Sequence, residues 1–338
     1  MIDYAAYPRP VVEDVARLRR RIAASKLPGK LTDRNLLVGT WNIRNFGQVY
    51  PSWDENPASP KRNLRALAYI AEVVRRLDVV AVQEVKRDTS GIRMLLDDFL
   101  GPDWGLILSD VTVGSEGNTE RLAFIYDRRR VQPSGLAGEI VLPPTGQGDP
   151  ARQFARTPYI VGFQSAGGTF ALLTAHIKYG QVPQDRLPEL QALAAHVAVE
   201  IRDRARTEHA EEQNLIVLGD FNIDKRSDNP LFQAFVFTGL TVPPQLWDLK
   251  TTYDTEPKYY DQVAWFMGDL DLLYNESAGV VNFAGAVYKD LTLQQMSFRV
   301  SDHFPLWVEF IVDRSTEHMA RTLGLNPAMP DPLSTVPD

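Results

Sequence analysis

The sequence predicts a layered α/β or α+β domain that contains two β-sheets. The chain has many short apolar runs with the character of buried strands, and amphipathic helices separate only some of them. Such elements are stable when they pack as layers around a shared core. Hydrophobic residues make up 44% of the 338 residues and charged residues 23%, as in an ordinary globular protein with a sizeable core. No internal repeat is present, so a solenoid or propeller is not expected.

The individual elements follow from the spacing of the apolar side chains. Apolar residues recur on one face of a helix over residues 11–24, 61–77 and 185–206. Pro188 falls in the first turn of the third helix, where proline is tolerated. Continuous apolar runs predict strands over residues 35–42, 79–82, 122–126, 159–163, 170–174, 215–218, 263–266 and 306–311.

We divide the chain into a helical N-terminal extension over residues 1–34, one central domain over residues 35–312 and a tail over residues 313–338. The tail is rich in proline and polar residues and is expected to contain about one helical turn.

Composition limits the possible functions. The chain has no cysteine, which excludes disulfides, thiolate metal sites and cysteine nucleophiles. Residues 1–4 lack the features of a signal peptide, and no run approaches the ~20 apolar residues of a membrane span. These features favour a cytoplasmic location, although export of a cysteine-free protein is also consistent with them. The net charge of −7 argues against non-specific coating of nucleic acid, but it allows a local basic cleft.

Several predicted strands end in acidic, amide or imidazole side chains. These residues are Asn42, Glu84, His176, Asp220 with Asn222, and the pair Asp302 and His303 before the last strand. Each one alone is typical of a turn, a solvated strand end or a structural histidine. Together they predict a site at one edge of the sheets, where rigid strands position polar groups. Carboxylate and amide oxygens without thiolates suit Mg²⁺ or Mn²⁺, whereas a structural zinc site needs four closed nitrogen or sulfur ligands.

Eight short segments occur in the order of a known superfamily. They are Trp41-Asn42-Ile43-Arg44-Asn45-Phe46-Gly47, Val82-Gln83-Glu84-Val85, Glu120-Arg121-Leu122-Ala123-Phe124-Ile125-Tyr126, Ala155-Arg156-Thr157-Pro158, Thr174-Ala175-His176, Leu218-Gly219-Asp220-Phe221-Asn222, Tyr260-Asp261-Gln262-Val263 and Ser301-Asp302-His303-Phe304-Pro305-Leu306. In this order, across residues 35–311, they resemble the endonuclease/exonuclease/phosphatase superfamily, and within it the deoxyribonuclease-I-type nucleases. The resemblance implies a two-layered β-sandwich with helices on the outer faces and an active site at one end. It makes residues 35–312 the catalytic domain.

The resemblance also implies a role for each matching residue. Glu84 would bind the metal together with Asn42 and Asp302, and Asp220 and Asn222 would hold the water and phosphate or a second metal. His303 resembles the general base, with Asp261 behind it. His176 resembles a phosphate-binding imidazole or general acid, with Glu120 as its partner. Arg156 would contact phosphate, and Arg44 and Lys86 fall where related nucleases place cations against the DNA backbone. The implied cofactor is Mg²⁺, with Mn²⁺ or Ca²⁺ as alternatives.

The substrate stays open at this stage because the superfamily acts on several kinds of phosphoester. Arg44, Lys86 and the segment around Arg156 favour a DNA endonuclease with little sequence preference. Asn118 stands where a stacking tyrosine is often found, and Gln262 replaces an arginine of that branch. An enzyme that acts on a lipid head group, nucleotide or other small phosphoester is the main alternative, and a non-catalytic binding module is a third. The sequence does not indicate the oligomeric state.

Overall fold

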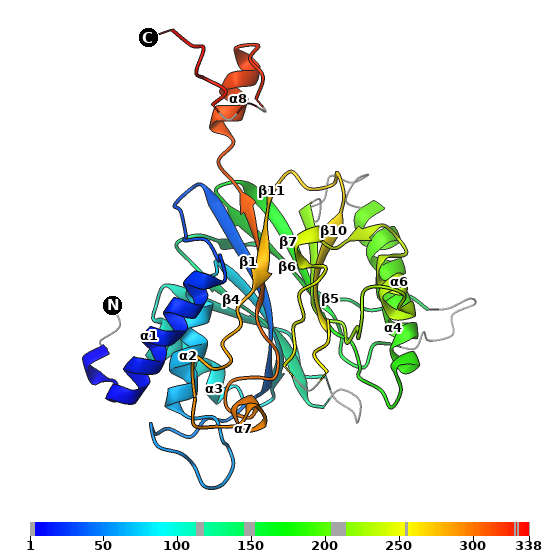
Figure 1. Ribbon diagram of the computed structural model, residues 1–338. Helices are drawn as coiled ribbons and strands as arrows, with labels where there is room; N and C mark the ends of the chain where they lie inside the picture. Colours follow the sequence, from blue (N-terminus) through cyan, green and yellow to red (C-terminus); the bar gives the residue numbers. More distant parts are fainter. Residues whose placement is uncertain are drawn as a thin grey trace.

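Two stacked β-sheets with helices on their outer faces form the molecule, as the sequence predicts (Figure 1). This computed structural model describes residues 4–112, 118–144, 153–203, 214–253, 256–327, 329 and 331–337. A continuous apolar core between the sheets includes Val38 and Phe124 from one sheet and Val161 and Leu218 from the other. The layering therefore follows from strands that bury apolar side chains on both faces.

The first sheet has six strands in the order β11-β12-β1-β2-β4-β3. Their bounds are β1 (Asn35–Phe46), β2 (Val79–Lys86), β3 (Trp104–Leu108), β4 (Glu120–Asp127), β11 (Leu273–Val280) and β12 (Leu306–Ile311). The central pair β1 and β2 is parallel, and the other neighbours are antiparallel. The outer face is covered by α1 (Arg9–Ala24), α2 (Leu64–Val74), α3 (Ser90–Met94) with the π-helical turn η2 (Leu95–Leu100), and α7 (Leu293–Ser297).

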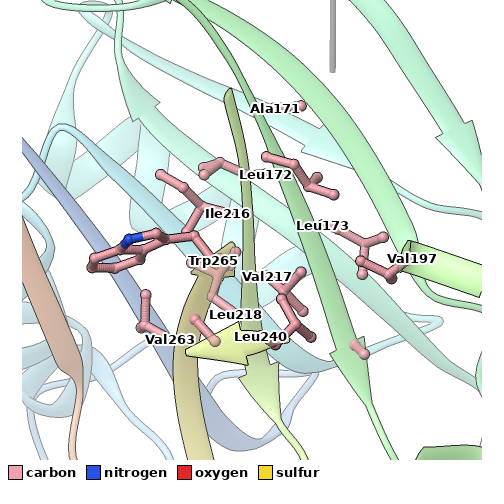
Figure 2. Packing of buried hydrophobic residues seen from close by; sticks show 14 of the residues in the cluster. Ala171, Leu172, Leu173, Val197, Ile216, Val217, Leu218, Leu240, Val263 and Trp265 are labelled. Atoms are coloured by element: carbon pink, nitrogen blue, oxygen red, sulfur yellow. The ribbon is translucent and has the colours of Figure 1, made fainter. Parts of the chain in front are cut away.

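The second sheet has the order β5-β6-β7-β8-β10-β9. Its strands are β5 (Gln132–Glu139), β6 (Tyr159–Ser165), β7 (Gly168–His176), β8 (Leu215–Asp220), β9 (Leu240–Thr241) and β10 (Asp261–Phe266). Strands β7 and β8 are parallel, which repeats the arrangement of β1 and β2. Helices α4 (Leu187–His196) and α6 (Pro230–Val236) pack on this sheet, and α4 continues into the π-helical turn η4 (Val197–Arg202). Figure 2 shows side chains of β7, β8 and β10 with Val197 in the core.

Most of the predicted elements are present, and the differences have local causes. The helix predicted over residues 61–77 begins at Leu64, because the side chain of Asn63 caps it by accepting from the backbone N–H of Ala66 at 3.2 Å. The helix predicted over residues 185–206 is divided into the 3₁₀ turn η3 (Pro183–Arg186), α4 and η4, and residues 204–206 lie outside the described residues. Strands β3, β5, β9 and β11 were not predicted. β9 has only two residues, and β5 and β11 are half-exposed and lack a continuous apolar run.

The two ends of the chain pack differently. Helix α1 buries Val11, Val15, Leu18 and Ile22 against α2 in the core cluster of the first sheet. The tail forms α8 (Ser315–Thr322), which has two turns instead of the expected one, and it projects from the body of the molecule (Figure 1). Among the described residues, no helix combines the length and the hydropathy that crossing a membrane requires.

Candidate active site

The predicted site residues gather in one cleft where the two sheets meet. The cleft has a volume of about 520 Å³, and ten of the twelve predicted residues line it. Asn42 and Asp261, the other two, are buried and contact lining residues directly. Behind the cleft, the side-chain amide of Gln83 in β2 donates to Thr40 in β1 at 3.0 Å and to Thr174 in β7 at 2.9 Å. This buried bridge connects the two sheets and fixes the spacing of the strands that carry the site.

Backbone irregularities point several of these side chains into the cleft. The register between β1 and β2 shifts after Asn42, and the register between β2 and β4 shifts between Val82 and Val85. Glu84 lies in this second bulge with a φ of 64°, a conformation that non-glycine residues rarely adopt. Asn42 and Glu84 therefore lie inside strands, at bulges, and not at strand ends as the sequence suggested.

A glycine before Asp220 is required by close backbone packing. Gly219 has a φ of 145°, and a Cβ atom there would lie 2.2 Å from the backbone oxygen of Ala175 in β7. The close approach of β7 and β8 places His176 opposite Asp220 in the parallel register. Gly219 thus sets the distance between two predicted catalytic side chains.

His303 and Asp261 form a buried pair from different parts of the fold. Nδ1 of His303 lies 2.8 Å from Oδ2 of Asp261, and the side chain of His303 is 9% exposed. Burial lowers the pKa of His303, but the carboxylates of Asp261 and Asp220 outweigh it and raise this pKa to about 10. Burial raises the pKa of Asp261 above its ordinary value. Because a carboxylate accepts from Nδ1, Nε2 of His303 is the nitrogen that faces the cleft.

His176 forms a second histidine–carboxylate pair on the opposite side. Its Nδ1 lies 3.0 Å from Oε2 of Glu120, and the same oxygen accepts from Nε of Arg156 at 2.6 Å. Nζ of Lys86 donates to the other oxygen, Oε1, at 3.0 Å. Burial raises the pKa of Glu120, but these three basic neighbours outweigh it and lower the pKa to about 2. Glu120 therefore stays ionised and holds three groups that can face an anion.

Asp220 lies between the two histidines. Its Oδ2 is 3.7 Å from Nε2 of His176 and 3.8 Å from Nε2 of His303. Oδ1 accepts from the backbone N–H of Asn222 at 2.9 Å, and Oδ2 accepts from Nδ2 of Asn42 at 2.8 Å. Burial raises the pKa of Asp220, but the two histidines and these hydrogen bonds outweigh it and keep the pKa below its ordinary value. A carboxylate thus stands between two imidazoles, one at the end of β7 and the other in the segment before β12.

Two of the three predicted metal ligands, Asn42 and Glu84, lie together and offer oxygen atoms that suit a hard divalent cation. Nδ2 of Asn42 donates to Oε1 of Glu84 at 3.0 Å, which brings an amide and a carboxylate together. Within the described part of the chain, the buried Oδ1 of Asn42 has no hydrogen-bond partner, so this oxygen is available to a cation. Asp220, Asp261 and His303 also have ligand atoms within 4.8 Å of one another. We favour the set with Glu84, because the pairing of Asp261 with His303 already explains the second cluster.

Asp302 and Arg44 form a salt bridge with each other, which the sequence did not predict. Nη1 of Arg44 donates to Oδ2 of Asp302 at 3.0 Å and to Oγ of Ser297 at 2.8 Å. The guanidinium also lies 4.2 Å from the centre of the Phe298 ring. Arg44 lines the cleft as expected of a cation that contacts DNA, but its charge is shared with the carboxylate assigned to the metal.

Three residues that lie at or directly behind the cleft were not identified from the sequence. Tyr179 and Tyr260 line the cleft, and Arg186 is buried beneath both of their rings. Arg186 also donates to the backbone oxygen of Asn222 at 2.6 Å and to Oδ2 of Asp224 at 2.8 Å. Tyr260 directly precedes Asp261, which was its only signal in the sequence.

A family model and two sequence relatives match most of this chain. A family model described as the Endonuclease/Exonuclease/phosphatase family matches residues 39–303. A protein named deoxyribonuclease from Thioalkalivibrio sp. (strain K90mix) is 27% identical over 325 residues, which cover 90% of this chain and 81% of that protein. Deoxyribonuclease gamma of Rattus norvegicus is 25% identical over 311 residues, which cover 86% of this chain and 89% of the relative.

A solved structure shares the fold at lower identity. The endonuclease/exonuclease/phosphatase from Bacteroides vulgatus has a TM-score of 0.56 and 15% identity, and the match covers 82% of this chain and 99% of that one. This likeness supports the stacked-sheet architecture and says nothing of the substrate.

Proposed function

Since the chain belongs to the endonuclease/exonuclease/phosphatase family, we propose that it is a divalent-metal-dependent phosphodiesterase that hydrolyses the DNA backbone with little sequence preference. The observation that carries this proposal is the pair of buried imidazoles, His176 and His303, on either side of Asp220. Each imidazole has its own carboxylate on the far nitrogen, Glu120 and Asp261 respectively. Two oppositely placed imidazoles suit a reaction that needs a base for water and an acid for the leaving oxygen.

The residues on the His303 side would activate the water. Nε2 of His303 accepts a proton from water, and Asp261 stabilises the imidazolium that forms and keeps the ring in one orientation. In the protein alone, the neighbouring carboxylates raise the pKa of His303 to about 10. Positive charge near Asp220 would lower this pKa and favour the neutral imidazole that acts as a base.

A divalent cation held by Glu84, Asn42 and Asp302 would supply that positive charge and would stabilise the charge that grows on the phosphoryl oxygens. The proposed ion is Mg²⁺, and Mn²⁺ or Ca²⁺ have the same preference for oxygen ligands.

The residues on the His176 side would hold the phosphate and the leaving oxygen. Within the described residues, the buried Nη1 of Arg156 has no hydrogen-bond partner, so this cationic donor is free for a phosphate oxygen. His176, whose Nδ1 lies beside the carboxylate of Glu120, can bind the phosphate or donate a proton to the leaving oxygen. Asn222, the remaining predicted residue, lines the cleft beside them.

DNA as substrate is supported by the cations at the cleft and by the names of the relatives. Lys86, Arg156 and Arg44 line the cleft and can contact successive phosphates, which position a strand without reading its sequence. Residues 242–247 and 265–267 are the two apolar segments that could contact lipid. Val242, Leu246 and Phe266 are buried in the core, and of the large hydrophobic side chains in these segments Trp247 and Met267 are exposed. We place the catalytic domain at residues 35–312, with residues 1–34 and 313–338 outside it.

Incubation of the pure protein with supercoiled plasmid and Mg²⁺ tests the proposal. Wild-type protein should nick and linearise the plasmid, and EDTA should prevent cleavage. His303→Ala should abolish activity, whereas His318→Ala, which changes an exposed histidine of α8, should leave it intact. A wild type that cleaves neither the plasmid nor a single-stranded oligonucleotide with Mg²⁺, Mn²⁺ or Ca²⁺ would refute a nuclease. Turnover of sphingomyelin or a nucleotide without DNA cleavage would instead support a phosphoesterase for small or lipid substrates.

A further inference from the structure

An aromatic corner borders the proposed reaction centre, and the catalytic assignment does not use it. Tyr179 and Tyr260 both line the cleft, and their ring centres are 6.2 Å apart with an angle of 78° between the planes. The ring of Tyr260 lies 6.0 Å from the ring of His303. Tyr179 follows the proposed acid His176 by only three residues. Two aromatic faces therefore stand directly beside the place of the scissile phosphate.

Tyr179 is exposed but rigidly supported. The residue is 57% exposed, an unusual fraction for an aromatic side chain so close to buried catalytic groups. Its ring lies 4.4 Å from the guanidinium of Arg186, which covers one face, and Nε of Arg186 donates to the backbone oxygen of Tyr179 at 2.7 Å. Arg186 is itself 2% exposed and is fixed by the backbone of Asn222 and by Asp224.

The loop after Tyr179 is also constrained. Gly180 has a φ of 71°, and a Cβ there would lie 2.5 Å from the Cβ of Asp185. The carboxylate of Asp185 accepts from the backbone N–H groups of Gln181 and Val182 at 2.8 and 3.2 Å. The constrained loop backbone and Arg186 thus support the ring, which reduces the conformational entropy that is lost when a flat ligand stacks on it.

We propose that Tyr179 and Tyr260 bind an unpaired nucleobase next to the scissile phosphate, so that the preferred substrate is a single strand or an unpaired region of DNA. This inference rests on the proposed function of the site. A base within a duplex is stacked on its neighbours and cannot reach the corner unless it leaves the helix. A base of a single strand can stack on Tyr179 while its edge meets Tyr260, and every base has a face that can do so. The corner therefore selects for strandedness and leaves sequence preference weak.

Binding of fluorescently labelled oligonucleotides in EDTA, measured by anisotropy, tests the inference without requiring cleavage. A base that stacks on an aromatic side chain contributes enough that Tyr179→Ala should weaken single-strand binding by about 5- to 100-fold. Tyr179→Phe keeps the ring and should bind like wild type. A strand with abasic residues should bind wild type as weakly as the normal strand binds Tyr179→Ala, and Tyr179→Ala should not weaken abasic-strand binding further. Phe237→Ala is the matched control, because this aromatic residue is 87% exposed and is not among the cleft-lining residues.

The outcomes separate the two proposals. Equal losses on a single strand and on a duplex of the same sequence would overturn the aromatic corner, and so would unchanged binding by Tyr179→Ala or equal affinity for the abasic strand. Failure of wild type to bind either form would overturn it as well. Plasmid cleavage reports separately on the proposed function. Cleavage without an effect of Tyr179→Ala on binding would contradict only the aromatic corner, and an effect on binding without cleavage would contradict only the nuclease.

Discussion

Replacing Glu120 with glutamine should destabilise the protein by about 3 kcal/mol at neutral pH, and most of this loss should vanish in acid. Glu120 is 4% exposed, and its basic neighbours lower its pKa from 4.5 to about 2. One pH unit is worth about 1.4 kcal/mol, so the folded state favours the charged form by about 3 kcal/mol. Because the folded pKa is lowered, this stability is fully present above pH 4.5 and is lost as pH falls toward 2.

Urea unfolding of wild type and Glu120→Gln at pH 7, 5, 4 and 3 measures the effect. The difference in the free energy of unfolding should be largest at pH 7 and pH 5 and should narrow at pH 4 and pH 3. Glu13→Gln is the control, because Glu13 is an exposed carboxylate that pairs only with the exposed Arg9 in the described contacts. A difference that stays constant across this range would refute the assignment of the lowered pKa to Glu120.

Three further predictions concern other parts of the site. Without divalent ions, the ring of His303 should stay protonated at pH 8. Asp261→Asn should lower the pKa of His303, because a stabilising carboxylate is lost. NMR titration of the histidine rings measures both effects. A refutation would be a wild-type ring that titrates near pH 6.5. Gly219→Ala should lower the free energy of unfolding by more than about 2 kcal/mol in urea, because its Cβ would lie 2.2 Å from a backbone oxygen of β7, and an unchanged midpoint would contradict the packing. Arg44→Gln should tighten Mn²⁺ binding by a few-fold in calorimetry, because it frees Asp302, and weaker binding would count against Asp302 as a metal ligand.

Much of the fold could be predicted because its central strands are apolar on both faces. In β1, Leu36 and Val38 face the core between the sheets, while Leu37 and Trp41 face the helices. Such strands appear as continuous apolar runs, which are easy to recognise. β5 contains Pro133 and is largely exposed at the edge of its sheet, so it has no such run.

The residues of the site could be predicted better than the contacts between them. Asp220 and His176 could be recognised because they follow apolar strands. Burial of a charged or imidazole group beside a core strand costs free energy, so such a group indicates a function. The sequence cannot show that Arg44 pairs with Asp302, since the two residues are separated by 258 positions and meet only in the folded chain. It also cannot show the bulge at Glu84, because a left-handed φ there depends on strand pairing.

The aromatic corner was hidden for a similar reason. Tyrosines are common both in cores and on surfaces, so Tyr179 and Tyr260 carry no distinctive pattern in the sequence. Their role as a binding surface is inferred from Arg186, which the fold places beneath both rings. A buried arginine that supports an exposed ring becomes visible only when helix and loop are packed together.

The most direct test of the central claim is the fate of oxygen from water during DNA cleavage. Wild-type protein with Mg²⁺ in ¹⁸O-labelled water should place one ¹⁸O atom in each new terminal phosphate, measured by mass spectrometry of the products. His303→Ala, which removes the proposed base, should yield no labelled product while its unfolding midpoint confirms an intact fold. Product phosphates without the label, or labelled product from His303→Ala at the wild-type rate, would contradict hydrolysis by this pair of imidazoles.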